Sequence, residues 1–84
     1  MSHLQNLLLQ AKEGLQPWER IPDAKLPIIV AQCGVAELAE IRARIDNLRE
    51  ELATIEEWDG DTQDDIHLAI GFFSKLADLV ENAL

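Results

Sequence analysis

The large aliphatic residues between positions 38 and 55 recur every three or four residues. Residues at this spacing share one side of an α-helix, whereas a half-buried strand would alternate apolar and polar residues. The sequence has no proline from position 28 to 58 and only Gly34 interrupts good helix formers there, so it predicts one long helix over about residues 28–58, with a kink at Gly34 left open. The stripe consists of Leu38, Ile41, Ile45, Leu48, Leu52 and Ile55.

A second apolar stripe follows a break at Asp59-Gly60-Asp61. Thr62 with Asp65 three residues later resembles a capping box, which predicts a helix over about residues 63–83. A parallel self-pairing of the first stripe would oppose Arg44 to Arg49 and Glu51 to Glu56, so the first stripe should face an antiparallel helix instead. Because the connection is short, the two helices form an antiparallel hairpin. The second stripe consists of Ile66, Ile70, Phe73, Ala77, Val80 and Leu84.

The first 27 residues predict a short helix and a connector. Ser2 is a suitable N-cap and Gly14 a suitable stop for a helix over about residues 3–13. Residues 16–27 contain three prolines, of which Pro27 suits the first turn of the next helix. Trp18, Ile21 and Leu26 are expected to cap the core, with an exposed Trp18 that anchors a partner as the alternative. We therefore predict an all-α protein with a single helical domain over residues 1–84.

The second hairpin helix is apolar over a wider arc than one neighbouring helix can cover. A chain of 84 residues is also near the lower size limit for a self-sufficient core. Both features predict a homo-oligomer. The expected oligomer interface consists of Leu68, Phe72, Leu76, Leu79 and Ala83.

Charge narrows the classes of partner. Sixteen acidic against seven basic residues give a net charge of −9, which disfavours direct binding to nucleic acid or an anionic membrane and favours a basic protein surface. Half of the acids gather around the hairpin turn. Three interpretations stay open for them: helix-end and turn chemistry, a patch for a basic partner, or a weak cation site. They are Glu50, Glu51, Glu56, Glu57, Asp59, Asp61, Asp64 and Asp65.

The sequence offers no catalytic or metal-binding pattern. A calcium-loop spacing that begins at Asp59 fails at the required glycine and at the bidentate glutamate, where Asp64 and Ile70 stand. His67 and Ser74 lie about 10.5 Å apart along a helix, too far for a base and its nucleophile. We therefore predict no enzyme activity, no cofactor and no metal. The single cysteine, Cys33, and the absence of a signal-peptide pattern predict a cytoplasmic location.

Trp58-Asp59-Gly60 in the turn between two helices resembles the Trp-x-Gly turn of the ESAT-6-like secreted helical hairpins. The resemblance implies a hairpin dimer exported without a cleaved signal. The chain contains no tyrosine, so it lacks the Tyr-xxx-Asp export signal of that family, and the proline-rich connector is not part of the family pattern. Without the resemblance, Trp58 would be expected to cap the hairpin core.

These features predict a small acidic interaction protein. By analogy with proteins of mobile elements, it would be an inhibitor that masks a basic, nucleic-acid-binding surface of its target. One alternative is a scaffold subunit that associates only with itself. Another is a binder of a small anionic ligand at a subunit interface, for which Arg42 and Arg49 are the available pair, although nearby acids such as Asp46 are their expected partners.

Overall fold

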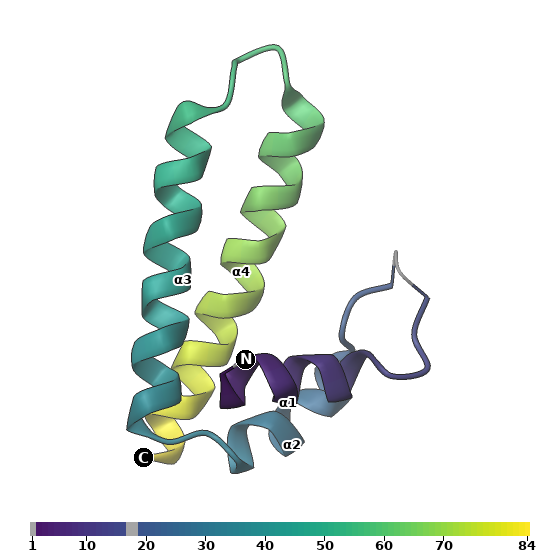
Figure 1. Cartoon of the computed structure of the whole chain (residues 1–84), viewed down its shortest axis with the longest axis vertical. Coiled ribbons are helices and arrows are strands. Elements are labelled where there is room, and N and C mark those ends of the chain that lie inside the picture. Colours follow the sequence, from purple (N-terminus) through teal and green to yellow (C-terminus); the bar gives the residue numbers. More distant parts are fainter. Residues whose placement is uncertain (1, 17–18) are drawn as a thin grey trace.

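The computed structural model describes residues 2–16 and 19–84, and every regular element within them is helical (Figure 1). This confirms the predicted all-α class. The helices are α1 (His3–Lys12), the short 3-10 helix η1 (Asp23–Lys25), α2 (Leu26–Ala31), α3 (Val35–Thr54) and α4 (Gly60–Ala83). Helices α3 and α4 run antiparallel as a hairpin, and α1 and α2 lie beside its open end, which we call the base.

Both predicted ends of the first helix are confirmed. The Ser2 hydroxyl accepts a hydrogen bond from the Gln5 backbone N–H, and the Gln5 side chain accepts one from the Ser2 N–H, which completes a capping box. Gly14 has a φ of 81°, a left-handed conformation that ends the helix and favours glycine. The Lys25 ammonium donates to the Ala11 carbonyl at 2.8 Å and so binds the negative end of α1.

The connector folds back onto the base of the hairpin. Ile21 and Leu26 are buried, as predicted, while Trp18 lies outside the described residues. Pro27 occupies the first turn of α2, where its missing N–H costs nothing. An ion pair of 2.8 Å between Lys75 on α4 and Asp23 on η1 joins the connector to the hairpin.

The predicted helix over residues 28–58 is wrong as a single element, because the chain breaks at residues 32–34 between α2 and α3. The physical reason is the phase of the two apolar stripes. In one straight helix, the buried face of α2, with Leu26 and Ile29, would point roughly 120° away from the face of α3. The break allows both faces to turn into one core.

The hairpin forms along the predicted stripes, with two corrected boundaries. Leu38, Ile41 and Ile45 are buried on α3, and they face a stripe on α4 that includes Ala77 and Val80. Helix α3 ends at Thr54 and α4 begins at Gly60, so the turn is longer than predicted. The N-cap of α4 is Asp59 rather than Thr62, since the Asp59 carboxylate accepts a hydrogen bond of 3.4 Å from the Thr62 N–H.

The core lies at the base of the hairpin. Its fully buried side chains come from α1, α2, α3 and the C-terminal half of α4, whereas Leu48, Leu52 and Ile55 toward the turn are only half-buried. Ser2 donates from its hydroxyl to Glu40 on α3 at 2.8 Å, which ties α1 to the hairpin. The turn end of the hairpin therefore projects beyond the core. The fully buried side chains are Leu4, Leu26, Ile41, Leu76 and Val80.

Candidate functional site: the acidic tip

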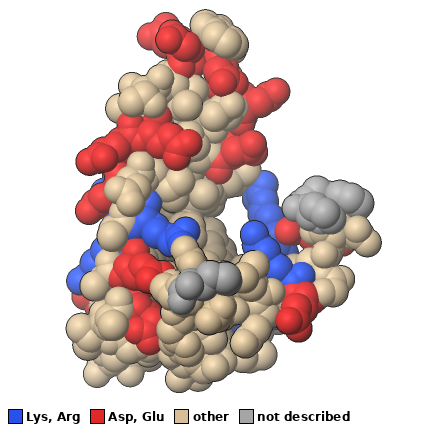
Figure 2. Space-filling model, in the orientation of Figure 1, with Lys and Arg blue, Asp and Glu red and all other residues tan. Residues whose placement is uncertain are grey.

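The projecting end of the hairpin carries the acid cluster that the sequence singled out. We define the acidic tip as residues 50–65, which comprise the end of α3, the turn and the start of α4. Figure 2 shows acidic side chains gathered over this end of the molecule, while the basic side chains on the same face lie lower down. All of its acids are exposed except Asp59, which is half-buried. The acids of the tip are Glu50, Glu51, Glu56, Glu57, Asp59, Asp61, Asp64 and Asp65.

Hydrogen bonds within the backbone and to it hold the turn in a defined shape. The Glu56 carbonyl accepts from the Asp59 N–H at 3.0 Å and from the Gln63 side-chain amide at 3.0 Å. The Asp59 carbonyl accepts from the Gln63 N–H at 3.2 Å. At the end of α3, the Thr54 hydroxyl donates to the Glu51 carbonyl at 2.7 Å. The tip is thus a shaped surface that positions its charged side chains outward.

Helix-end chemistry explains only two of the eight acids. Asp59 caps α4 and Asp61 lies in its first turn, where the positive end of the helix dipole favours a carboxylate. Glu51 lies in the last turn of α3, which contains no basic residue, and Glu50 lies directly before that turn. Acids at the negative end of a helix destabilise it. Glu51 therefore stands where it costs stability, and Glu50 adds a weaker unfavourable interaction one residue earlier.

Trp58 is the residue that sequence reasoning misplaced. We expected it to cap the hairpin core, but it lies in the turn with 82% of its surface exposed. A core cap requires apolar side chains beneath the turn, and at this end the α3 stripe is only half-buried, while the buried Ile66 of α4 lies outside the main core cluster. The available signal was the surrounding sequence: acids flank Trp58 on both sides, and none of the four nearest residues is a large hydrophobe.

The acids of the tip have no cationic partner within residues 2–16 and 19–84. The two ion pairs of that part of the chain are Lys75 with Asp23 and Arg42 with Glu81, the latter at 3.2 Å, and both lie away from the tip. A partner protein that brings cations to the tip would therefore break no internal ion pair.

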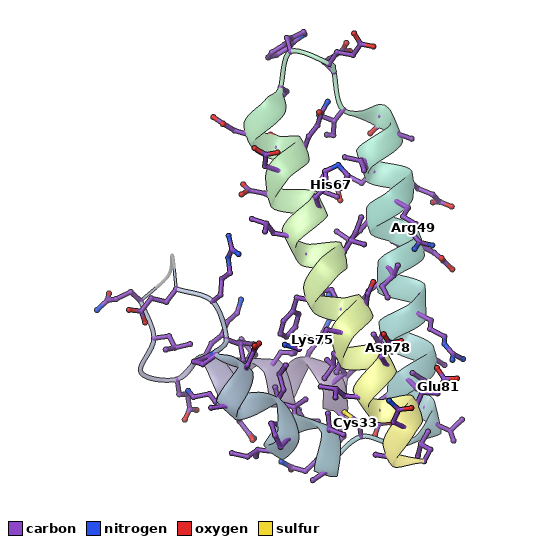
Figure 3. The ribbon with its side chains drawn as sticks, turned by 180° about the vertical axis from the view of Figure 1, so that it is seen from behind. Cys33, Arg49, His67, Lys75, Asp78 and Glu81 are labelled. Atoms are coloured by element: carbon purple, nitrogen blue, oxygen red, sulfur yellow. The ribbon has the colours of Figure 1, made fainter. Side chains whose placement is uncertain are left out.

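The arginine pair suggested for an anionic ligand is not arranged for one. Arg42 pairs with Glu81 on α4 rather than with Asp46 as expected. Arg49 lines a shallow groove of about 310 Å³ between α3 and α4, and Asp78 and Glu81 on α4 line it too (Figure 3). Asp46 is a third acid of this groove. Negative charge surrounds both arginines, which disfavours an anion there.

The remaining candidates for chemistry stay apart. Within the described residues, no three histidine, cysteine, aspartate or glutamate side chains lie close enough to hold a metal ion. Burial raises the pKa of the Cys33 thiol above its ordinary value, and the neighbouring Glu37 carboxylate raises it further. This environment disfavours the thiolate that a reactive cysteine needs. His67 is exposed toward the tip, away from Cys33 at the base (Figure 3).

The predicted oligomer residues lie in different environments. Leu76 is fully buried within the single chain, so it belongs to the core of one copy and offers no surface to another. Its position opposite α1 and α2 explains this, since those helices cover the base. Leu68 is 45% exposed, Phe72 and Leu79 are half-buried, and Ala83 is exposed.

Comparison of the chain with protein-family models, with curated proteins and with solved structures finds no match. The resemblance to the ESAT-6-like hairpins thus rests on Trp58-Asp59-Gly60 and the hairpin alone. None of the described helices is both long enough and apolar enough to cross a lipid bilayer.

Proposed function

We propose that this chain is a non-catalytic interaction protein whose acidic tip binds a basic surface of another protein. The observation that carries the proposal is the combination, at one projecting end, of a tryptophan that is 82% exposed with eight acids that have no cationic partner among the described residues. Tryptophan is among the residues that contribute most to binding energy at protein interfaces. Its ring also attracts lysine and arginine side chains.

The position of the acids supports binding over solubility as their role. Solubility requires only net charge, which could be spread over the surface. Glu50 and Glu51 instead lie at the destabilising end of α3. Such a loss of stability at a surface site is typical of residues kept for an interaction.

The target class follows from the charge. A surface that binds nucleic acid is rich in lysine and arginine, because these side chains neutralise phosphates. A compact acidic projection with an aromatic side chain can bind the same lysine and arginine side chains of the target. The proposed outcome is inhibition, in which the tip excludes nucleic acid from the target.

The test uses the fluorescence of Trp58 in a Trp18→Phe background, with a lysine- and arginine-rich peptide as probe. The tip variant carries Glu51→Lys, Glu56→Lys and Glu57→Lys. The control variant carries Glu13→Lys, Asp46→Lys and Asp78→Lys, which are equally exposed acids outside the tip. Both variants change the net charge of −9 by the same amount, so only the site differs.

We expect the tip variant to lose at least about tenfold in affinity, and the control to lose less than about threefold, because close charges contribute more than distant screened ones. Equal losses in both variants would reject the tip as the binding site. The inhibitory step is tested by displacement of duplex DNA from a basic DNA-binding protein. Wild-type chain should displace the duplex and the tip variant should not.

A further inference from the structure

A groove of about 570 Å³ lies between α4 on one side and α1 with the connector on the other. Its floor is apolar, and its rim carries Lys12 and Arg20 on the α1 side and Asp65 on α4. Glu19 also lines it, and its carboxylate accepts from the Gln16 N–H at 3.2 Å. The apolar lining consists of Leu8, Ile21, Leu68, Ala69, Phe72 and Phe73.

The face of α4 that lines this groove continues beyond it to Lys75, and over this length its order of charge is complementary to itself. Asp65, Leu68, Phe72 and Lys75 are spaced by three, four and three residues, so they share one face of α4. The face is negative toward the tip, apolar in the middle and positive toward the base. A second copy of the same face, turned end to end, would place an acid opposite each base.

The register follows from the numbering. An antiparallel pair of α4 helices with its twofold axis at residue 70 places Leu68 of each copy against Phe72 of the other. The same axis places Asp65 of each copy opposite Lys75 of the other. A symmetric interface requires one patch to match itself in this way.

We propose that two copies of this chain associate through this groove, with the α4 helices antiparallel about residue 70. Leu68, which is 45% exposed in the single chain, becomes buried against Phe72 of the other copy. Lys75 exchanges Asp23 for Asp65 of the other copy. This exchange costs little because the existing pair is exposed on both sides, at 52% and 79%.

One further feature favours a second copy as the occupant. The antiparallel arrangement directs the two acidic tips to opposite ends of the dimer. The like charges of the two tips are thereby kept apart. The inference does not rest on the proposed function, although Asp65, one of the acids of the tip, takes part in both.

The test is sedimentation equilibrium of the full chain over a series of concentrations. Wild type should dimerise reversibly. Leu68→Asp should raise the dissociation constant at least about tenfold, since it places two carboxylates in the apolar centre of the interface. The matched control is Leu9→Asp, which changes another leucine that is 54% exposed but lies outside the groove. It should dimerise as wild type does.

The register is tested by charge exchange. Asp65→Lys and Lys75→Asp, made singly, should each raise the dissociation constant about tenfold because each opposes like charges twice. The double variant re-forms both pairs in reverse and should return to within about threefold of wild type. Circular dichroism confirms that each variant stays helical. A monomeric wild type, a dimer that tolerates Leu68→Asp, or a double variant as weak as the singles would overturn the proposal.

Discussion

Ile41 has no exposed surface and lies in the stripe of α3 that faces α4. Truncating it removes buried methyl groups and leaves a cavity in a close-packed region. We predict that Ile41→Ala lowers the free energy of unfolding by about 2–5 kcal/mol, measured by urea denaturation. The control is Val35→Ala on the same helix, where 73% of the side chain is exposed and the change should stay within about 0.5 kcal/mol. Equal effects at both positions would mean that the stripe does not hold the hairpin.

Replacing each of two glycines by alanine should change the stability of the chain in opposite directions. Gly14 has a φ of 81°, which a side chain disfavours, so Gly14→Ala should destabilise the chain by about 1 kcal/mol. Gly71 lies within α4, and a methyl group there would meet no atom within 4 Å. Gly71→Ala should stabilise by about 0.5–1 kcal/mol, because alanine loses less backbone entropy in a helix. Thermal denaturation measures the change in stability of each variant relative to wild type. If both variants were stabilised, or both destabilised, the assigned conformation of Gly14 would be contradicted.

At the scale of the helix, α3 carries acidic side chains near its C-terminus, which is the negative end of the helix dipole. Replacing Glu50 and Glu51 by lysine reverses an unfavourable interaction with the dipole and reduces repulsion within the tip. We predict that the double variant is more stable than wild type by roughly 0.5–2 kcal/mol in low salt, with a smaller gain in high salt. Urea denaturation at two salt concentrations measures it. A loss of stability would mean that these acids support the fold and are not kept for binding.

The sequence predicted the helical elements better than their boundaries. The three-and-four spacing of Leu38, Ile41 and Ile45 depends only on local geometry, so the seam of the hairpin could be found from it. Gly34 marked the place of the break at residues 32–34 but did not decide between a kink and a full break, because good helix formers surround it on both sides. The break arises from tertiary packing, which must bring the faces of α2 and α3 into one core.

The acids of the site could be located from the sequence, and its aromatic residue could not. Placing eight acids at one end required only that the chain reverse near Asp59. The exposure of Trp58 depends on how much apolar surface lies beneath the turn, and that is set by the position of α1 and α2 at the opposite end of the hairpin. Periodicity contains no information about that position.

At the scale of the whole molecule, the fold and the proposed site are separated along the hairpin. The chain measures 39 × 28 × 23 Å, and its closely packed core is concentrated at the base. The tip contributes little buried surface, so its residues can suit a binding partner with little loss of folding stability. This division explains why a small protein can carry repelling charges in one place and remain folded.

The most direct test of the account is a two-dimensional NMR titration of isotope-labelled chain with a lysine- and arginine-rich peptide. We predict that the resonances that shift belong to residues 50–65 and include the indole N–H of Trp58, whereas the amides of α1 and α2 stay in place. Shifts centred on α1 or α2, or no shift at the tip when the peptide is in excess, would contradict the account.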